Sequence, residues 1–216
     1  MNIILFGPPG AGKGTQADII AKSFNLHKIS TGDLLREEIN NKTHLGEEIK
    51  SIINAGALVS DNVINDLIDN ILIDKKFHNR LIFDGIPRNL NQAKNLDILL
   101  QKYNQNITCV LNLNVEKEQI LKRILGRLTC TKCGQIFNDY FKRSTAETHS
   151  CGDKFLTKRS DDSEKIVLHR FDTYLNKTLP ILEYYKKLNL LHEINGKAEI
   201  VEISKEISQI ITSLGT

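Results

Sequence analysis

The sequence has no tryptophan, one methionine and four prolines in 216 residues, and it has no long apolar run. A membrane-spanning helix needs about 20 consecutive apolar residues, so we expect no membrane anchor. Met1 leads directly into a short strand-like run, so we expect no secretory signal. The chain also lacks a strong net charge, because 29 basic and 26 acidic residues leave only +3. This balance argues against a protein that wraps nucleic acid.

The chain is also poor in cysteine, with four residues of this type. A disulfide scaffold is therefore not expected, and we expect a cytoplasmic protein with reduced thiols. The length fits one domain, or one domain with an insertion. No heptad or exposed apolar stripe indicates a partner chain, so a monomer is expected. Three of the cysteines cluster between positions 130 and 151, in a segment that needs its own explanation.

Short apolar runs alternate with helical patterns along most of the chain. Such alternation predicts a mostly parallel sheet covered by helices on both faces. The strands are expected at 2–6, 27–30, 81–83, 107–111 and 190–195. The helices are expected at 13–23, 33–41, 43–55, 61–73, 90–103, 116–125, from 161 onward with Pro180 ending or kinking the helix, and at 200–214. Between 126 and 160 the helical period disappears, which indicates an inserted subdomain.

A phosphate-binding loop follows the first strand. Gly7-Pro-Pro-Gly-Ala-Gly-Lys13-Gly-Thr15 has the spacing of a P-loop and lies between a strand and a helix. Small residues let backbone N–H groups turn toward a phosphate, and the helix N-terminus adds its dipole. Lys13 would neutralise the terminal phosphates. Gly14 stands where a generic P-loop has a serine or threonine for Mg²⁺, so Asp84, at the end of the third strand, is the expected metal-side carboxylate.

Several further motifs, taken together, resemble the adenylate kinase family. They are Ile29-Ser-Thr-Gly-Asp-Leu-Leu-Arg36, Phe83-Asp-Gly-Ile-Pro-Arg88 with Gln92, Arg123-Ile-Leu-Gly-Arg127, and Arg159-Ser-Asp-Asp162 with Arg170. The resemblance covers essentially the whole chain, and the length of 126–160 is similar to the long-lid bacterial branch. It implies a three-layer α/β fold of the P-loop nucleoside triphosphate hydrolase type, with a central five-stranded parallel sheet. It also implies three parts: a core (1–29, 60–125 and 161–216), a helical AMP-binding insertion (30–59) and a small β-rich lid (126–160).

The resemblance further implies reversible transfer of the terminal phosphoryl group of MgATP to AMP, giving two ADP. A transferring phosphoryl group carries charge that cations must stabilise. The catalytic set implied is Lys13, Asp84, Arg88, Arg123, Arg159 and Arg170. The residues implied to bind ATP are Gly10, Ala11, Gly12, Lys13, Gly14, Thr15, Arg123, Arg127, Ile136, Phe137 and Lys197. Those implied to bind AMP are Thr31, Arg36, Ala57, Leu58, Val59, Gly85, Ile86, Pro87, Arg88, Gln92, Arg159 and Arg170.

The cysteine cluster predicts a structural zinc site inside the lid. Cys130 and Cys133 form a C-x-x-C-Gly knuckle whose thiolates can face one metal, and Cys151 offers a third. We expect His149 to be the fourth ligand, with Asp153 as the alternative. A metal-free lid and a redox pair are the other interpretations of this cluster. Cys109 lies in an apolar strand and is expected to be buried.

Three other functions remain open from the residues. Another nucleoside monophosphate kinase would share most of these motifs. A nucleotide-dependent switch protein is disfavoured because Gly14 replaces the metal-binding hydroxyl and no Asn-Lys-x-Asp motif is present. A zinc-ribbon nucleic-acid binder is disfavoured by the small net charge. We therefore expect ATP, AMP and ADP as partners, and neither nucleic acid nor a membrane.

Overall fold

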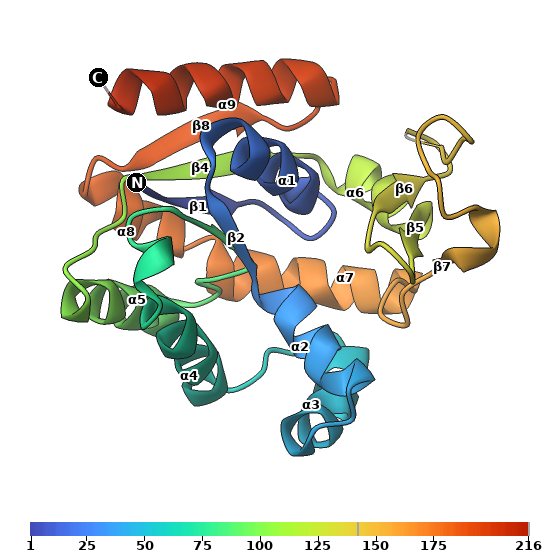
Figure 1. Cartoon of the computed structure of the whole chain (residues 1–216), viewed down its shortest axis with the longest axis horizontal. Coiled ribbons are helices and arrows are strands. Elements are labelled where there is room, and N and C mark those ends of the chain that lie inside the picture. Colours follow the sequence, from blue (N-terminus) through green and yellow to red (C-terminus); the bar gives the residue numbers. More distant parts are fainter. Residues whose placement is uncertain (142, 216) are drawn as a thin grey trace.

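The protein, described at residues 1–141 and 143–215 by a computed structural model, is built on a parallel five-stranded sheet. The strand order is β2-β3-β1-β4-β8 (Figure 1). The bounds are β1 (Asn2–Phe6), β2 (His27–Ser30), β3 (Leu81–Asp84), β4 (Cys109–Asn114) and β8 (Leu191–Asn195). Every pairing between neighbouring strands is parallel. The predicted fold class is confirmed. Strand β1 is almost continuously apolar because it is buried on both faces of the sheet.

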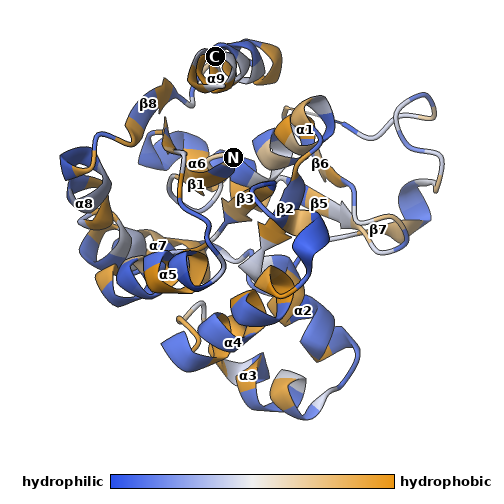
Figure 2. Cartoon of the chain, turned by 60° about the vertical axis from the view of Figure 1, so that its left-hand side comes forward, coloured by the Kyte–Doolittle hydropathy of each residue, from blue (hydrophilic) through white to orange (hydrophobic). Residues whose placement is uncertain are grey.

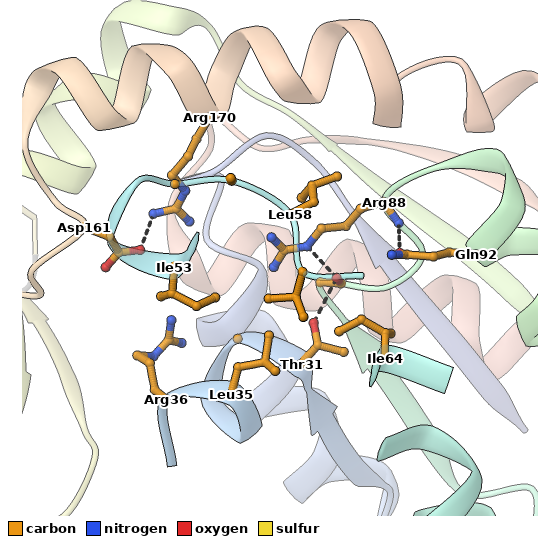
Figure 3. A pocket seen from close by; sticks show the side chains of 15 residues that line it. Thr31, Leu35, Arg36, Ile53, Leu58, Ile64, Arg88, Gln92, Asp161 and Arg170 are labelled. Carbon is orange, nitrogen blue, oxygen red and sulfur yellow. Dashed lines mark hydrogen bonds and ion pairs between the residues drawn. The ribbon is translucent and has the colours of Figure 1, made fainter. Parts of the chain in front are cut away.

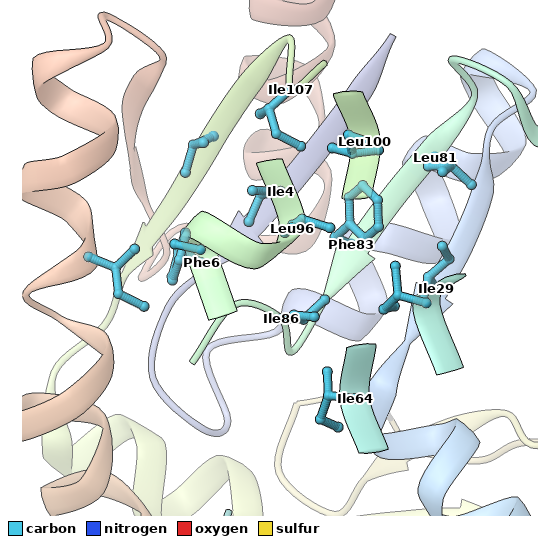
Figure 4. Close-up of a cluster of buried hydrophobic side chains, with 14 of the residues drawn as sticks. Ile4, Phe6, Ile29, Ile64, Leu81, Phe83, Ile86, Leu96, Leu100 and Ile107 are labelled. Carbon is cyan, nitrogen blue, oxygen red and sulfur yellow. The ribbon is translucent and has the colours of Figure 1, made fainter. Parts of the chain in front are cut away.

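Two hydrophobic clusters cover the two faces of this sheet. On one face, Ile3 and Leu5 of β1 pack against α1 (Lys13–Phe24) and α9 (Ile200–Leu214). On the other, Ile4 and Phe6 join the cluster drawn in Figure 4, to which α4 (Asp61–Leu72), α5 (Leu90–Lys102) and α8 (Ile181–Lys187) contribute. Consecutive residues of a strand point to opposite faces, so one short strand supplies both cores. Figure 2 shows hydrophobic and hydrophilic residues interspersed along the covering helices, as expected for helices with one buried face.

Two parts project from the central sheet, one toward the bottom and one toward the right of Figure 1. The first is the helical pair α2 (Thr31–Asn40) and α3 (His44–Asn54), capped by the Ser30 and Thr43 side chains. The second is a small antiparallel sheet of order β6-β5-β7. Its strands are β5 (Arg127–Cys130), β6 (Ile136–Asn138) and β7 (Leu156–Thr157), and α6 (Lys117–Leu125) leads into it.

The segment after the small sheet begins its helix later than the sequence predicted. The α7 helix spans Glu164–Thr173 rather than beginning at 161, because Asp161 and Asp162 lie before it and pair with arginines. A π-helical turn (Tyr174–Thr178) follows, and Pro180 stands at the N-cap of α8, where its missing N–H removes no helical hydrogen bond. Short 3₁₀ turns at Lys75–Phe77 and Asp153–Phe155 complete the described elements. Within 1–141 and 143–215, each helix falls short of the length and apolarity that crossing a membrane requires.

Candidate active site

The loop between β1 and α1 has the form that phosphate binding needs. Gly12 is the N-cap of α1 with φ 97°, in the left-handed region that favours glycine. The N-terminal N–H groups of α1 have no partner within the helix and are available to an anion. The Lys13 Nζ donates to the carbonyl oxygens of Gly7 at 2.7 Å and Pro8 at 3.0 Å, which holds the ammonium over the loop.

Asp84 lies at the carboxyl end of β3, directly beside the loop. A Cβ atom added to Gly14 would be 3.6 Å from the Asp84 Oδ2, so this carboxylate faces the start of α1. Burial raises the pKa of Asp84, while the neighbouring Lys13 opposes that rise. Burial also lowers the pKa of Lys13 to about 8, partly offset by Asp84. A carboxylate oxygen beside a phosphate loop suits Mg²⁺, which prefers oxygen ligands and binds with the substrate phosphates.

A cavity of about 420 Å³ extends from the loop to the small sheet. All eleven residues expected to bind ATP line it, including Ile136 and Phe137 from β6 and Lys197 after β8. The Arg123 guanidinium closes one side by donating to the carbonyl oxygens of Ala11 at 3.1 Å and Gly196 at 2.9 Å. The exposed rings of Tyr140 and Phe141 also line this cavity, with Arg123 5.8 Å from the Phe141 ring centre.

A second, smaller pocket opens between α2, the loop after α3 and the end of β3 (Figure 3). Of the residues expected to bind AMP, this pocket is lined by Thr31, Arg36, Ala57, Leu58, Val59, Gly85, Arg88, Gln92 and Arg170. The remaining three lie next to it: Ile86 and Pro87 line an adjoining hollow behind Gly85, and Arg159 lines the larger cavity. The Thr31 hydroxyl and the Arg88 Nε both donate to the Gly85 carbonyl, at 2.9 and 2.7 Å.

The two pockets meet at a group of cations. Arg36, Arg88 and Arg170 line both of them, and Lys13, Arg127 and Arg159 line the larger one. Burial and the neighbouring positive charges lower the pKa of Arg88 and that of Arg159 to about 10, so both stay charged at neutral pH. Like charges brought together in a partly dry cleft need an anion of high charge.

Acidic residues hold several of these arginines in place. Arg170 Nη1 donates to Asp161 at 2.6 Å, and Arg127 forms a bidentate ion pair with the buried Asp162. Arg159 lies 3.8 Å from Asp33 of α2 across the cleft. A neighbouring contact from the Ser160 hydroxyl to Asn54 at 2.9 Å also joins the small sheet's segment to the helical pair.

The cysteine cluster lies in the small sheet, away from the cations. The ligand atoms of Cys130, Cys133, His149 and Cys151 all lie within 4.8 Å of one another. Zinc binds cysteine sulfur at about 2.3 Å and histidine nitrogen at about 2.0 Å in a tetrahedron, so this donor set and its spacing fit a structural Zn²⁺. His149 Nε2 lies 3.7 Å from the Cys133 Sγ. His149 is therefore in the cluster, as expected, whereas Asp153 is outside it.

Asp153 instead contacts His149 indirectly, through the Ser144 hydroxyl. The Ser144 hydroxyl donates to the Asp153 carboxylate at 2.8 Å and lies 3.1 Å from His149 Nδ1. Because a hydroxyl has one proton and this one goes to the carboxylate, Nδ1–H must be the donor to Ser144. The lone pair of Nε2 is then free to face the thiols. A hydrogen bond at the other ring nitrogen commonly fixes the orientation of a metal-binding histidine in this way.

Sequence reasoning missed several residues of the site. Leu35, Ile53 and Ile64 give the smaller pocket its apolar wall. Asp61 is a hydrogen-bond partner of Gln92. Tyr140 and Phe141 lie in a segment without helical or strand periodicity, so the sequence pattern did not predict their place at the cavity. Their aromatic side chains, close in sequence to Ile136 and Phe137, could have indicated it. Cys109 is fully buried in β4, as expected, and burial raises the pKa of its thiol to about 12.

A P-loop at the carboxyl edge of a parallel sheet, with two pockets joined by arginines, defines a phosphotransferase of two phosphorylated substrates. A family model for adenylate kinase matches residues 5–190. The chain is 49% identical to an adenylate kinase of Pelagibacter ubique over 211 residues, which covers 98% of this chain and 99% of the relative. It is 41% identical to one of Methanothrix thermoacetophila (98% and 99% covered) and 42% identical to one of Fusobacterium nucleatum (98% of each). The chain belongs to the adenylate kinase family.

Proposed function

We propose a role for each group of residues lining the two pockets in the reaction that this chain catalyses as a member of its family. That reaction is the reversible transfer of the terminal phosphoryl group of MgATP to AMP, giving two ADP. The observation that carries the assignment is the junction of the two pockets. Arg36, Arg88 and Arg170 line both, so a phosphoryl group passing from one nucleotide to the other would remain among cations throughout.

The larger cavity is assigned to ATP. The backbone of 10–15 and the Lys13 ammonium bind the β- and γ-phosphates, and Arg123 and Arg127 approach them from the small-sheet side. The adenine lies toward Phe137 and residues 197–200, all of which line this cavity. Bound with ATP, Mg²⁺ supplies positive charge to the phosphate oxygens, and Asp84 is the carboxylate placed to hold it.

The smaller pocket is assigned to AMP. Arg36 and Arg88 bind its phosphate, Thr31 and the backbone at 57–59 and 85–87 line the nucleoside, and Gln92 meets the base. Bound in this way, the phosphate oxygen of AMP and the γ-phosphorus of ATP would face each other with Arg159 and Arg170 alongside. Holding both reactants in line, with charge stabilisation already in place, is the main source of rate in phosphoryl transfer.

The parts 30–59 and 126–160 are proposed to move as two flaps on a core made of 1–29, 60–125 and 161–216. Closure excludes water, which would otherwise attack the γ-phosphoryl in place of AMP. The Arg159–Asp33 and Ser160–Asn54 contacts support this, because each joins one flap or its edge to the other. Distances between labels at Lys154 and Lys205 should shorten when a bisubstrate inhibitor binds. Unchanged distances would contradict motion of 126–160 relative to the core.

Turnover with ATP and AMP in Lys13→Met tests the assignment of the larger cavity. Lys13 is expected to act on charge that develops in transfer, so kcat should fall by about two to three orders of magnitude. The matched control is Lys22→Met on the exposed side of the same helix, which should keep wild-type turnover. Near-normal turnover in Lys13→Met, with the fold intact, would refute the assigned role.

A further inference from the structure

Gln92, at one end of the smaller pocket, has its side-chain amide held at both ends by the protein. Its Oε1 accepts from the backbone N–H of Arg88 at 2.8 Å, a contact drawn in Figure 3. Its Nε2 donates to Asp61 Oδ1 at 2.7 Å. The residue is only 2% exposed, so neither contact competes with bulk water.

These two partners leave the amide a single orientation. A carboxylate only accepts hydrogen bonds and a backbone N–H only donates. Nε2 must therefore face Asp61, and Oε1 must face Arg88. Asp61 begins α4 and reaches the start of α5, where the Asn89 Nδ2 also donates to its Oδ1 at 2.9 Å. Asn89 in turn caps α5 by accepting from the Gln92 backbone N–H at 2.8 Å.

We propose that Asp61 is a positioning residue that sets base specificity in the acceptor pocket by fixing the polarity of the Gln92 amide. The proposal rests on the assignment of this pocket to AMP. With one N–H and one lone pair already engaged, the amide offers one N–H and one lone pair to a base. Adenine presents an acceptor at N1 beside a donor at its 6-amino group, which complements that pair.

A 6-oxopurine presents the opposite pattern, with a donor at N1 and an acceptor at O6. It could be matched only by inverting the Gln92 amide. Inversion would place Oε1 against the Asp61 carboxylate and the NH₂ group against the Arg88 N–H, so both contacts would become repulsive. A site whose buried polar groups are left mispaired discriminates strongly against the wrong ligand. Asp61 thus selects adenine without touching it.

The probe pair is AMP and inosine monophosphate, which is close to AMP in shape but has the inverted hydrogen-bond pattern. We would measure kcat and KM for each with saturating ATP in wild type, Asp61→Ala, Asp61→Asn, Gln92→Ala and the double variant Asp61→Ala/Gln92→Ala. Asp66→Ala, an exposed carboxylate on the same helix, is the matched control. Melting temperatures identify any variant that is poorly folded. The isosteric Asn variant can offer either an oxygen or an NH₂ group, so it permits inversion with little change in packing.

In Asp61→Ala the ratio of kcat/KM for AMP to that for inosine monophosphate should fall about tenfold. The change should lie in KM, with kcat for AMP nearly unchanged. In Asp61→Asn this ratio should fall less than in Asp61→Ala. In Asp66→Ala the ratio should equal that of the wild type. Because Asp61 acts through Gln92, adding Asp61→Ala to Gln92→Ala should narrow the ratio no further.

A wild-type ratio in both Asp61 variants, alongside a narrowed ratio in Gln92→Ala, would overturn the proposal. So would an unchanged ratio in Gln92→Ala itself, since the base would then be read elsewhere. Both results differ from failure of the proposed function, in which the wild-type protein would not use AMP as its preferred acceptor.

Discussion

Arg127 and Asp162 join the two ends of the small-sheet segment. Arg127 Nε donates to Asp162 Oδ2 at 2.8 Å, and a second contact links Arg127 Nη2 to Oδ1. The side chains are 14% and 1% exposed, so this is a buried, bidentate pair. Arg127 stands at the first position of β5 and also lines the ATP cavity. One arginine therefore anchors the segment and lines the cavity that we propose for ATP.

Removing Asp162 should destabilise the protein. Asp162→Ala leaves the Arg127 charge without its partner in a buried setting, which typically costs about 3–5 kcal/mol. Denaturant unfolding of Asp162→Ala, Arg127→Ala and the double variant measures the coupling. The double variant should lose clearly less stability than the sum of the two single losses. Simple additivity would show that the pair does not act as a unit.

ATP binding should take up a proton near pH 8.5. The folded-state pKa of Lys13 is lowered to about 8 by burial, so the ammonium is lost as pH rises through that value, well below its ordinary 10.5. Phosphates favour the charged form and should raise this pKa again. Calorimetry in buffers of different ionisation enthalpy measures the uptake. Equal uptake in Lys13→Met would mean that another group titrates.

The protein purified without chelator should contain about one zinc per chain. Cys130→Ser should lose most of it, whereas Cys109→Ala, which changes a thiol in the central sheet, should keep it. Wild-type protein with far less than one zinc per chain would contradict the site.

Ser144→Ala should retain zinc less tightly, because His149 loses the hydrogen bond at Nδ1 that orients it. Second-shell losses of this kind typically cost 10–100-fold in metal affinity. Competition with a chromogenic chelator measures the difference. Thr145→Ala, which removes a hydroxyl that bonds to Thr148 within its own turn, is the neighbouring control. Equal zinc affinity in Ser144→Ala and wild type would exclude the orienting role.

The parts of the fold that could be predicted are those determined by interactions between residues close in sequence. The first strand, the glycine turn and the helix from Lys13 follow from apolar runs and from residues that permit a left-handed backbone. The choice between His149 and Asp153 could not be made from spacing, because it depends on how the 126–160 segment folds back on itself. The late start of α7 likewise depends on arginines elsewhere that pair with Asp161 and Asp162.

The least predictable contacts join residues distant in sequence. Asp61 and Gln92 are separated by 31 positions, and both lie near the starts of ordinary amphipathic helices. Nothing in either helix pattern marks their contact, which arises from the packing of α4 against α5. Tyr140 and Phe141 are exposed and line the larger cavity. The hydrophobic pattern of a sequence predicts buried residues, so it could not predict the position of these two.

The central claim is that ATP and AMP meet in the joined pockets for phosphoryl transfer. The most direct test is transfer from ATP measured against AMP, CMP, UMP and GMP as acceptors. AMP should have the highest kcat/KM, with two ADP formed for each ATP and AMP consumed and little free phosphate released. Preference for another monophosphate, or hydrolysis of ATP without transfer, would contradict the account.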